Sequence, residues 1–442
     1  MKAILTTPPQ LFQAIFHDGL LEVAREVGFV QRLRDFHPVE FARIFCLSLI
    51  GVARLTLQEI ASELGITAAA VCKRLQQSAA SEFFRRLLLH TLEELNQLVA
   101  ARIAIPLLSR FGGIYLLDGT IVMLPPELAD LFPGHGGGEG ADDQRSKAAV
   151  KIMTRFRLDC PGCLELFLSA ARRSDIESAA PLSDLPAGAL LLADLGFFDG
   201  ETLAKLTKSG IFWLTRLPPK INVRLGHGGE SWCDLLDGLE SLDRRGIHEF
   251  DGLAEVSQAT PFWARLFVQR CPEAIAAQRR RQLHERMRRK GKSVRRRQLS
   301  WCDWWVLATN VKPDRLNARE AFCLYRSRWQ IELMFKRWKS LGCLPIPRDH
   351  SRNRALCELY ARLVGVAVME WLALLRGGIL SGQSAWLGWK AAKKLVPLIL
   401  LAMEGKLSWE VVLSKLEHLL RTRPKQARRK KRPSTRQRLF RK

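Results

Sequence analysis

The sequence predicts an α/β protein in which a helical N-terminal segment precedes a core of short strands and helices, and a basic tail follows. Through the first hundred residues, apolar side chains recur every three or four positions, which is typical of amphipathic helices. From Gly113 onward, short apolar runs bounded by turn residues predict strands. After about Leu420 the chain is basic and has no apolar period, so we expect a tail that is disordered until it meets a partner.

The same two kinds of spacing predict the individual elements. Helices are expected over residues 40–57, 58–64, 67–76, 81–103 and 201–208. Strands are expected over residues 114–117, 190–193, 211–217 and 304–308, with a hairpin formed by residues 149–158 and 164–168. Residues 218–300 fit this scheme poorly and are interpreted as an insertion. One long helix over about 317–340 and one apolar helix over 356–376 complete the core.

Charge separates this chain from an acid-balanced metabolic enzyme. The 442 residues contain 69 Lys and Arg against 44 Asp and Glu, a formal net charge of +25. Residues 271–300 and 421–442 together supply +21 of that charge. The excess therefore predicts a polyanionic partner that two segments contact.

The cysteines and the apolar segments exclude several other classes. Ten cysteines are too few for a disulfide scaffold, and the pair Cys160 and Cys163 flanks a Pro-Gly turn without a second pair to complete a zinc site. The start of the chain lacks a signal-peptide core. The apolar stretch 363–375 contains Glu370 and is too short to span a bilayer. We expect a soluble protein of a reducing compartment, with no membrane partner.

Two apolar strands are each expected to end in an aspartate, Asp118 in Leu116-Leu117-Asp118-Gly119-Thr120 and Asp194 in Leu192-Ala193-Asp194-Leu195-Gly196-Phe197. A carboxylate at the end of a buried strand is costly unless a cation meets it. A single aspartate in this position most often caps the next helix. Two of them form a candidate site.

A polar stripe on the predicted helix 317–340 carries more information. At about 100° per residue, Tyr325, Arg328, Glu332 and Lys339 fall within about 60° of one another. Arg328 and Glu332 could simply form an ion pair on a solvated face. The apolar and aromatic residues around them favour a packed helix whose polar stripe faces a site.

The spacing Tyr-(2)-Arg-(3)-Glu-(6)-Lys of this stripe resembles the signature of the IS-four group of DDE transposases. The segments Thr309-Asn310, Asp194-x-Gly196-Phe197 and Asp118-Gly119-Thr120 also resemble that family, and the resemblance covers roughly residues 110–376. It implies an RNase H-like catalytic core with a β-rich insertion and a catalytic, metal-binding triad of Asp118, Asp194 and Glu332. It also implies that Tyr325, Arg328 and Lys339 hold the phosphates of transposon ends.

The chemistry of these residue types agrees with the resemblance. Three carboxylates can hold two Mg²⁺ ions, for which we expect Mn²⁺ to substitute. Such a pair activates a water or a 3′-hydroxyl for in-line displacement at phosphorus. No histidine base is needed, and none of the nine histidines lies in these motifs. Arg328 and Lys339 would contact phosphate oxygens beside the metals.

Residues 56–76 resemble a helix-turn-helix, with Gly65 at the turn and Thr67 and Lys73 exposed on the second helix for contact with DNA. Residues 68–70 are all alanine and offer few groups to read bases, so a plain helical packing unit stays open as the alternative. The basic run and the tail are expected to bind phosphates without reading sequence. The candidates in the run are Arg279, Arg280, Arg281, Arg295, Arg296 and Arg297.

These expectations combine into five segments. They are a helical DNA-binding domain at 1–110, the RNase H-like core at 111–217 and 301–376, an insertion subdomain at 218–300, and a C-terminal helical segment with a basic tail at 377–442. The predicted function is transposition of a bacterial insertion sequence, in the cytoplasm and at the nucleoid. Its partner is double-stranded DNA, both transposon ends and target, bound by a dimer in the synaptic complex.

The residues also allow two other interpretations. A transposase-derived DNA-binding protein without catalytic activity would keep the triad but would not assemble into an active complex. A phosphatase loop of the Asp-x-Asp-Gly-Thr type would need an aspartate two positions before Asp118, where the chain has Leu116. The complete triad and stripe favour the active enzyme.

Overall fold

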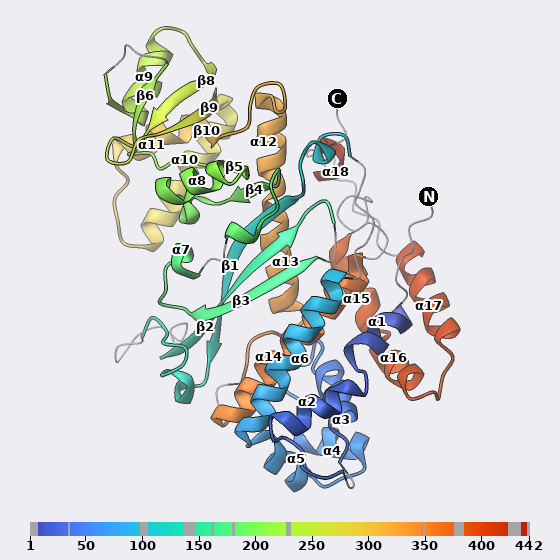
Figure 1. Cartoon of the computed structure of the whole chain (residues 1–442). Helices are drawn as coiled ribbons and strands as arrows, with labels where there is room; N and C mark the ends of the chain where they lie inside the picture. Colours follow the sequence, from blue (N-terminus) through green and yellow to red (C-terminus); the bar gives the residue numbers. More distant parts are fainter. Residues whose placement is uncertain are drawn as a thin grey trace. The chain divides into compact units, whose positions relative to one another are not determined.

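A computed structural model describes most of the chain, and its cartoon is shown in Figure 1. The described residues are 8–33, 36–97, 105–136, 147–160, 163–178, 182–226, 231–347, 350–374, 384–422 and 435–439. The chain divides into two compact units. The first unit comprises residues 1–104, 118–180 and 329–442, and the second comprises residues 105–117 and 181–328.

The first unit begins with six helices: α1 (Pro8–Ile15), α2 (Gly19–Glu26), α3 (Pro38–Ser48), α4 (Leu57–Leu64), α5 (Ala68–Leu75) and α6 (Ser78–Gln97). Their shared core is aromatic, because Phe29, Phe41 and Phe83 are almost fully buried and their rings pack together. The predicted helix 40–57 ends early, at Ser48. The chain turns there at Gly51, whose φ of +71° is a left-handed conformation that favours glycine.

The centre of the first unit is α14 (Arg352–Leu374), which packs against α3, α6 and α15 (Ala385–Lys393). Every residue from Ala355 to Leu374 is buried. The side chain of Arg362 is fully buried and donates to the carbonyl oxygens of Val52 and Cys343 at 2.8 and 2.7 Å. The apolar stretch is therefore a core helix. No helix formed by the described residues has the length and apolar character needed to cross a bilayer.

The first unit also holds three strands in the order β3-β2-β1. Strand β1 (Ile114–Leu124) enters this unit at Asp118, and β2 (Ala148–Arg157) and β3 (Leu164–Ala170) form the predicted antiparallel hairpin. The Sγ atoms of Cys160 and Cys163, at the closed end of that hairpin, lie 3.3 Å apart as free thiols. The remaining elements of the first unit are η2 (Pro126–Leu128), α7 (Asp175–Ser178), α13 (Trp329–Ser340), α16 (Val396–Met403), α17 (Trp409–Thr422) and α18 (Thr435–Leu439).

The prediction of a tail without structure is wrong for α18. This short helix lies within the basic tail, buries Leu439, and is tied to α13 by a hydrogen bond of 2.7 Å from Gln330 Nε2 to Thr435 Oγ1. A buried leucine gives this segment an apolar anchor that the surrounding basic residues obscure in the sequence. The rest of the predicted tail, 423–434 and 440–442, lies outside the described residues.

The second unit is built on a mixed sheet in the order β1-β4-β5-β10-β9-β8-β6-β7. The residues of β1 in this unit, Ile114–Leu117, pair in parallel with β4, and β4 pairs in parallel with β5, whereas β10 is antiparallel to β5. The strands are β4 (Leu190–Ala193), β5 (Phe212–Thr215), β6 (Asn222–Leu225), β7 (Cys233–Asp234), β8 (Glu249–Val256), β9 (Phe262–Arg270) and β10 (Trp304–Thr309). The helices are α8 (Gly200–Lys208), α9 (Leu235–Arg244), α10 (Glu273–Arg289), α11 (Arg296–Ser300) and α12 (Ala318–Ser327), with short 3-10 turns η1 (Leu108–Arg110), η3 (Leu182–Asp184), η4 (Leu195–Phe197) and η5 (Trp301–Asp303).

The observed architecture confirms the α/β class, adds one detail and corrects another. The strands of 218–300 continue the sheet, because β9 pairs with β10 along all of Trp304–Thr309 and β8 then pairs with β9. The predicted helix 317–340 is interrupted at Arg328, which separates α12 from α13. Helix α12 begins with a capping box between Asn317 and Glu320, close to the predicted start.

Candidate active site

Asp194 is positioned by the end of a buried parallel strand. Strand β4 ends at Ala193, and the tight turn η4 begins at Leu195, so the aspartate is the first residue beyond the sheet. Its side chain makes no cap hydrogen bond to that turn and is 36% exposed. The sequence is compatible with a capping aspartate, but the carboxylate instead meets side chains from two other segments of the second unit.

Three side chains surround the Asp194 carboxylate. The Arg216 guanidinium lies 3.2 Å from Oδ1, and the Tyr325 hydroxyl donates to the same oxygen at 3.2 Å. The Arg328 guanidinium lies 3.7 Å from Oδ2. We call Asp194, Arg216, Tyr325 and Arg328 the Asp194 cluster. The structure thus brings together three of the residues that the sequence singled out, and it adds a fourth.

Arg216 is a functional candidate that the sequence motifs do not indicate. It follows β5, and the register of β4 and β5 pairs Leu192 with Leu214, so Arg216 stands opposite Asp194 two positions later. Its Nε donates to the Tyr325 hydroxyl at 3.1 Å, and its guanidinium carbon lies 5.5 Å from the centre of the tyrosine ring. The parallel register of two short strands was the signal that could have identified this residue.

Tyr325 and Arg328 come from the end of α12. The last turn of this helix closes with a hydrogen bond of 3.1 Å from the Arg328 backbone N–H to the Tyr325 carbonyl, which keeps the two side chains one turn apart. Arg328 is only 4% exposed. A buried guanidinium requires a carboxylate or other acceptors, and Asp194 supplies this charge.

The cluster controls the charge of its members. Partial burial opposes ionisation of Asp194, but the guanidinium groups of Arg328 and Arg216 outweigh it and hold the pKa of the carboxyl below its ordinary value. Burial raises the pKa of the Tyr325 hydroxyl, although Arg216 opposes this. At neutral pH the cluster therefore holds an ionised carboxylate and a protonated tyrosine.

The other predicted members of the triad and the stripe, Asp118, Glu332 and Lys339, belong to the first unit. Asp118 does not end its strand, since β1 continues to Leu124. The residues after Asp118 alternate between buried and half-buried, as expected for a strand with one covered face. The half-buried Asp118 carboxylate accepts from the Gly119 N–H at 2.8 Å. Glu332 lies half-buried in the first turn of α13, and Lys339 lies exposed in its last turn. These two positions are seven residues apart and share one side of α13, while Trp338 lies on its buried side.

The donor chemistry of the predicted triad suits a hard divalent cation, because each member offers carboxylate oxygens. Two of the three acids lie in the first unit and one in the second. Among the residues that the structure describes, no group of three or more His, Cys, Asp or Glu side chains is gathered so that it could hold a metal ion.

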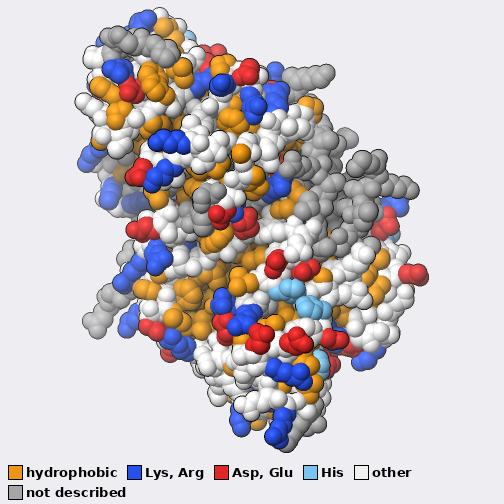
Figure 2. Space-filling model, in the orientation of Figure 1, with side chains coloured by type: hydrophobic (Ala, Val, Ile, Leu, Met, Phe, Trp, Pro, Cys, Tyr) orange, Lys and Arg blue, Asp and Glu red, His pale blue; other side chains and the backbone are white. Residues whose placement is uncertain are grey.

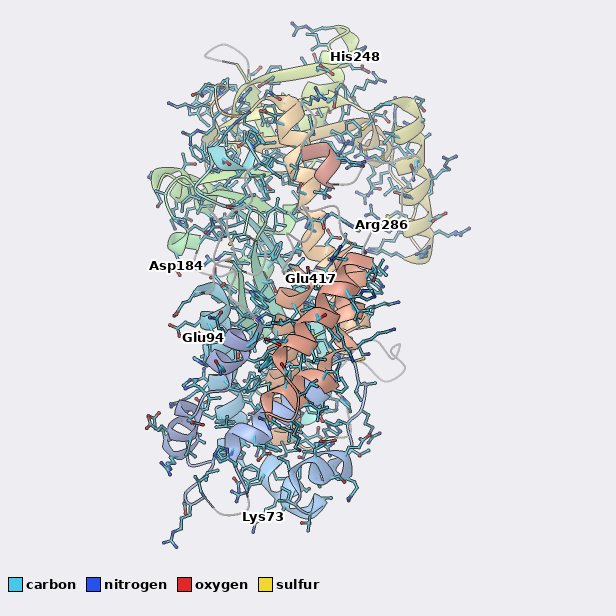
Figure 3. All side chains as sticks on the ribbon, turned by 90° about the vertical axis from the view of Figure 1, so that its right-hand side faces the viewer. Lys73, Glu94, Asp184, His248, Arg286 and Glu417 are labelled. Atoms are coloured by element: carbon cyan, nitrogen blue, oxygen red, sulfur yellow. The ribbon has the colours of Figure 1, made fainter. Side chains whose placement is uncertain are left out.

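The predicted helix-turn-helix region folds as two short helices around a left-handed glycine. Thr56 and Glu59 form a capping box on α4, Gly65 ends α4 with a φ of +65°, and the Thr67 hydroxyl caps α5. Lys73 is exposed on α5, and Figure 3 shows it at the outer end of these helices. Arg74, which stands where such motifs often have an apolar residue, packs 4.6 Å over the ring of Phe36.

The six arginines predicted for the basic run fall into two groups. Arg279 donates to the Trp304 carbonyl at 2.8 Å, Arg280 is paired with Asp303, and Arg297 with Asp237 at 2.7 Å. Arg281, Arg295 and Arg296 are exposed. The internal partners of the first three arginines leave Arg281, Arg295 and Arg296 as the phosphate-binding candidates among the six.

Comparison with known proteins identifies the family. A family model described as "Transposase DDE domain" matches residues 109–367, more than half of the chain. The chain belongs to the DDE transposase family. The matched region includes Asp118, Asp194, Tyr325, Glu332 and Lys339, and the predicted resemblance to the IS-four group is confirmed.

Insertion-sequence transposases are also similar along most of the chain. The transposase of IS231B from Bacillus thuringiensis subsp. berliner is 24% identical over 370 residues, which cover 79% of this chain and 76% of the relative. The transposase of IS231F from Bacillus thuringiensis subsp. israelensis is 24% identical, covering 81% and 77%. The transposase of IS1151 from Clostridium perfringens is 23% identical over 271 residues, covering 58% and 56%. These relatives support a transposase role for this DDE family member.

Proposed function

We propose that this DDE transposase mobilises a bacterial insertion sequence by binding its ends, cutting the DNA strands there and joining them to target DNA. The observation that carries the proposal is the Asp194 cluster, an ionised carboxylate held by a tyrosine and two arginines within the family's matched region. We assign Asp118, Asp194 and Glu332 as the catalytic acids on an RNase H-like core. The core would comprise segments 111–217 and 301–376.

The reaction needs no covalent intermediate with the protein. In cleavage, a water oxygen attacks the phosphorus at the element boundary and the 3′-oxygen of the neighbouring nucleotide leaves with a proton. In joining, the freed 3′-hydroxyl loses its proton and attacks a phosphorus of target DNA in line, and the 3′-oxygen of the target strand leaves with a proton. Mg²⁺, or Mn²⁺ in its place, held by the three acids would lower the activation barrier of both displacements by stabilising the negative charge on the phosphate oxygens.

The basic members of the site would hold the scissile phosphate. Arg328 and Arg216 present donors beside the Asp194 carboxylate, and a guanidinium fork suits phosphate oxygens as well as carboxylate oxygens. The Tyr325 hydroxyl would hold Arg216 and Asp194 in place, because it accepts a hydrogen bond from Arg216 and donates one to Asp194. Lys339, exposed in the last turn of α13, would add a point charge to the phosphate backbone.

DNA recognition is assigned to other segments. We propose that the N-terminal helices of 1–110 bind the element ends, with the motif at 56–76 presenting Thr67 and Lys73 to the major groove. Arg281, Arg295, Arg296 and the basic tail after about Leu420 would contact phosphates. Two ends must be brought together for transposition, so the complex on DNA is expected to be a dimer.

The decisive experiment is cleavage of a labelled duplex that carries the element's own flanking ends, with Mg²⁺ or Mn²⁺ against EDTA. The wild type is compared with Asp194→Asn and Glu332→Gln, which keep side-chain shape and remove charge. Glu240→Gln on the exposed side of α9 is the matched control. Metal-dependent nicking at the boundary that both site variants lose, while they still bind the duplex, supports the proposal. Binding without cleavage by the wild type in every metal would favour a DNA-binding relic, and cleavage by Glu332→Gln would overturn the triad.

A further inference from the structure

The basic run at 279–297 in the second unit has a side that packs against the protein and a side that is exposed. We infer that its exposed side forms a surface that binds the phosphate backbone of duplex DNA without reading sequence. We call this surface the α10 basic face, and it comprises Arg281, Arg286, Arg288, Arg289, Lys290, Lys292, Arg295 and Arg296, all of which are exposed. The inference deepens the proposed function and rests on DNA being the substrate.

The inner side of α10 is structural. Ala276 and Leu283 are buried there. Arg279 donates to the Trp304 carbonyl at 2.8 Å and to Cys271 Sγ at 2.9 Å, which ties α10 to β10. Arg280 pairs with Asp303. These arginines could contact DNA only by giving up bonds that hold the helix to the sheet.

On α10 two arginines form a row on the outer side, and the other exposed basic residues lie around its last turns. Arg281 and Arg288 are seven residues apart, so they lie on one stripe and about 10 Å apart along the helix axis. Arg289 follows Arg288 at about 100° around the helix, on the neighbouring exposed side. Helix α10 is about 25 Å long at 1.5 Å per residue, a length that spans several phosphates of a duplex spaced at about 3.4 Å per strand.

Acidic partners for this face are scarce. Residues 281–296 contain eight Lys and Arg and one acid, Glu285. The contact between Glu285 and Arg289 is 3.9 Å long, and their side chains are 61% and 80% exposed, so it contributes little. Arg286 stands three and four positions before Arg289 and Lys290, and like charges at these spacings repel each other. A polyanionic partner would relieve this repulsion.

The helix dipole explains only part of the pattern. Basic residues near the end of a helix are favourable, which accounts for Arg288, Arg289 and Lys290. Arg295 and Arg296 stand at the N-terminus of α11, where a positive charge is unfavourable. Their presence there is unexplained by the stability of the helix, and it is expected for a surface that binds phosphates.

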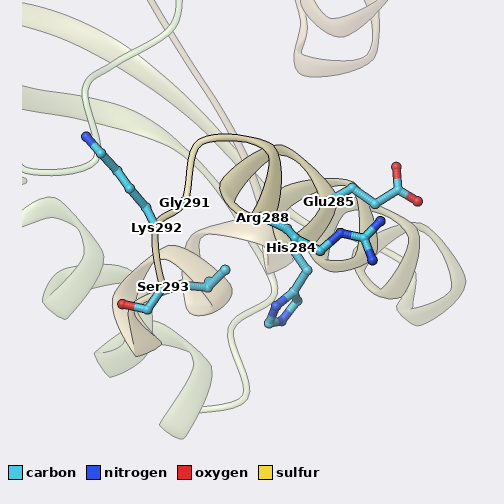
Figure 4. Close-up of a pocket in the computed structure, with 7 residues that line it drawn as sticks. His284, Glu285, Arg288, Gly291, Lys292 and Ser293 are labelled. Carbon is cyan, nitrogen blue, oxygen red and sulfur yellow. The ribbon is translucent and has the colours of Figure 1, made fainter.

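A turn and a short exposed segment connect α10 to α11. The chain turns at Gly291, with a φ of +64°, beside a hollow of about 480 Å³ lined by His284, Arg288 and Lys292. Figure 4 shows Glu285 and Arg288 extending to one side of α10 and Lys292 to the other. The basic groups spread over a broad surface and do not converge on one point, which suits an extended backbone better than a small anion.

The test measures binding of the full-length protein to two duplexes of equal length by fluorescence anisotropy between about 50 and 300 mM salt, the range over which phosphate contacts dominate. One duplex carries the element end and the other an unrelated sequence. The variant is Arg281→Gln, Arg288→Gln and Arg289→Gln combined. The control, Lys208→Gln, Arg244→Gln and Arg245→Gln, removes the same charge from exposed positions elsewhere in the second unit. Thermal melts check that both remain folded.

If all three arginines contact phosphates, the slope of log affinity against log salt becomes shallower by about 2.7, which corresponds to affinity roughly 500-fold lower at 0.1 M salt. The same loss on both duplexes, with the control like the wild type, supports the inference. A slope unchanged from the wild type, or a loss confined to the element end, overturns it while leaving the proposed function intact. A wild type that binds neither duplex overturns the proposed function itself.

Discussion

At the scale of single residues, the Asp194 cluster shows what a family signature can and cannot locate. The spacing of the signature named Tyr325 and Arg328, and the structure places both against Asp194. Arg216 belongs to no such spacing, and an arginine after a strand usually indicates a solvated turn. Its place opposite Asp194 follows from the parallel pairing of β4 with β5, a long-range relation that residue patterns do not encode.

The first prediction concerns Arg216. Arg216→Gln removes one of two cations from the Asp194 carboxylate and a donor from the Tyr325 hydroxyl, so the rate of strand cleavage should fall about 10- to 100-fold, as expected for a lost charged hydrogen bond of about 1.5–3 kcal/mol. Single-turnover cleavage at saturating protein measures the effect. Arg216→Lys should restore part of the rate because it returns the charge, which a purely structural role would not require.

The matched control for Arg216 is Arg326→Gln. Arg326 is also exposed and adjoins Tyr325, but its guanidinium lies 5.4 Å from the centre of the Trp305 ring. The assignment of Arg216 to the site is contradicted if Arg216→Gln and Arg326→Gln cleave at the same rate, or if the loss appears only through weaker DNA binding.

At the scale of elements, apolar patterns locate most strands and helices, but polar interruptions are misleading. The segment Asp118-Gly119-Thr120 suggests the end of a strand, yet β1 runs through it because Thr120 and Val122 return their side chains to the buried face. The apolar period of 317–340 continues across Arg328, so the interruption between α12 and α13 is invisible to it. Burial of Arg328 against Asp194 is a tertiary contact.

The second prediction tests the attachment of α13, the helix that carries Glu332. Arg337 on α13 and Glu370 on α14 form a nearly fully buried ion pair, with Arg337 Nε donating to Glu370 Oε2 at 3.1 Å. Glu370→Leu leaves the Arg337 charge buried and unpaired, so the free energy of unfolding should fall by about 3–5 kcal/mol. Urea denaturation of the full chain measures it.

The double variant Arg337→Met with Glu370→Leu serves as the control for this pair. It replaces both charges with apolar groups of similar volume and should recover most of the lost stability. If the double variant is no more stable than Glu370→Leu alone, the loss reflects packing around position 370, and the pair does not anchor α13.

At the scale of the whole molecule, charge is more predictable from the sequence than architecture. The excess of Lys and Arg is a property of the composition, and its concentration in two segments is evident from the sequence. On the face shown in Figure 2, basic, acidic and apolar side chains are interspersed. The continuity of the sheet through residues 218–300 was not predicted, because β9 finds its partner β10 only after the intervening α10 and α11. Short apolar runs indicate strands, but they do not indicate which strands pair.

The last prediction concerns the basic tail. A chain ending at Thr422 loses eleven Lys and Arg, so its affinity for any duplex should fall and the slope of log affinity against log salt should become shallower. Truncation also removes α18 and its hydrogen bond to Gln330, two residues before Glu332. Thr435→Val in the full chain separates the two effects, because it removes that bond and no charge. We expect Thr435→Val to keep the wild-type salt slope, and an unchanged slope in the truncated chain would show that the tail charges do not contact DNA.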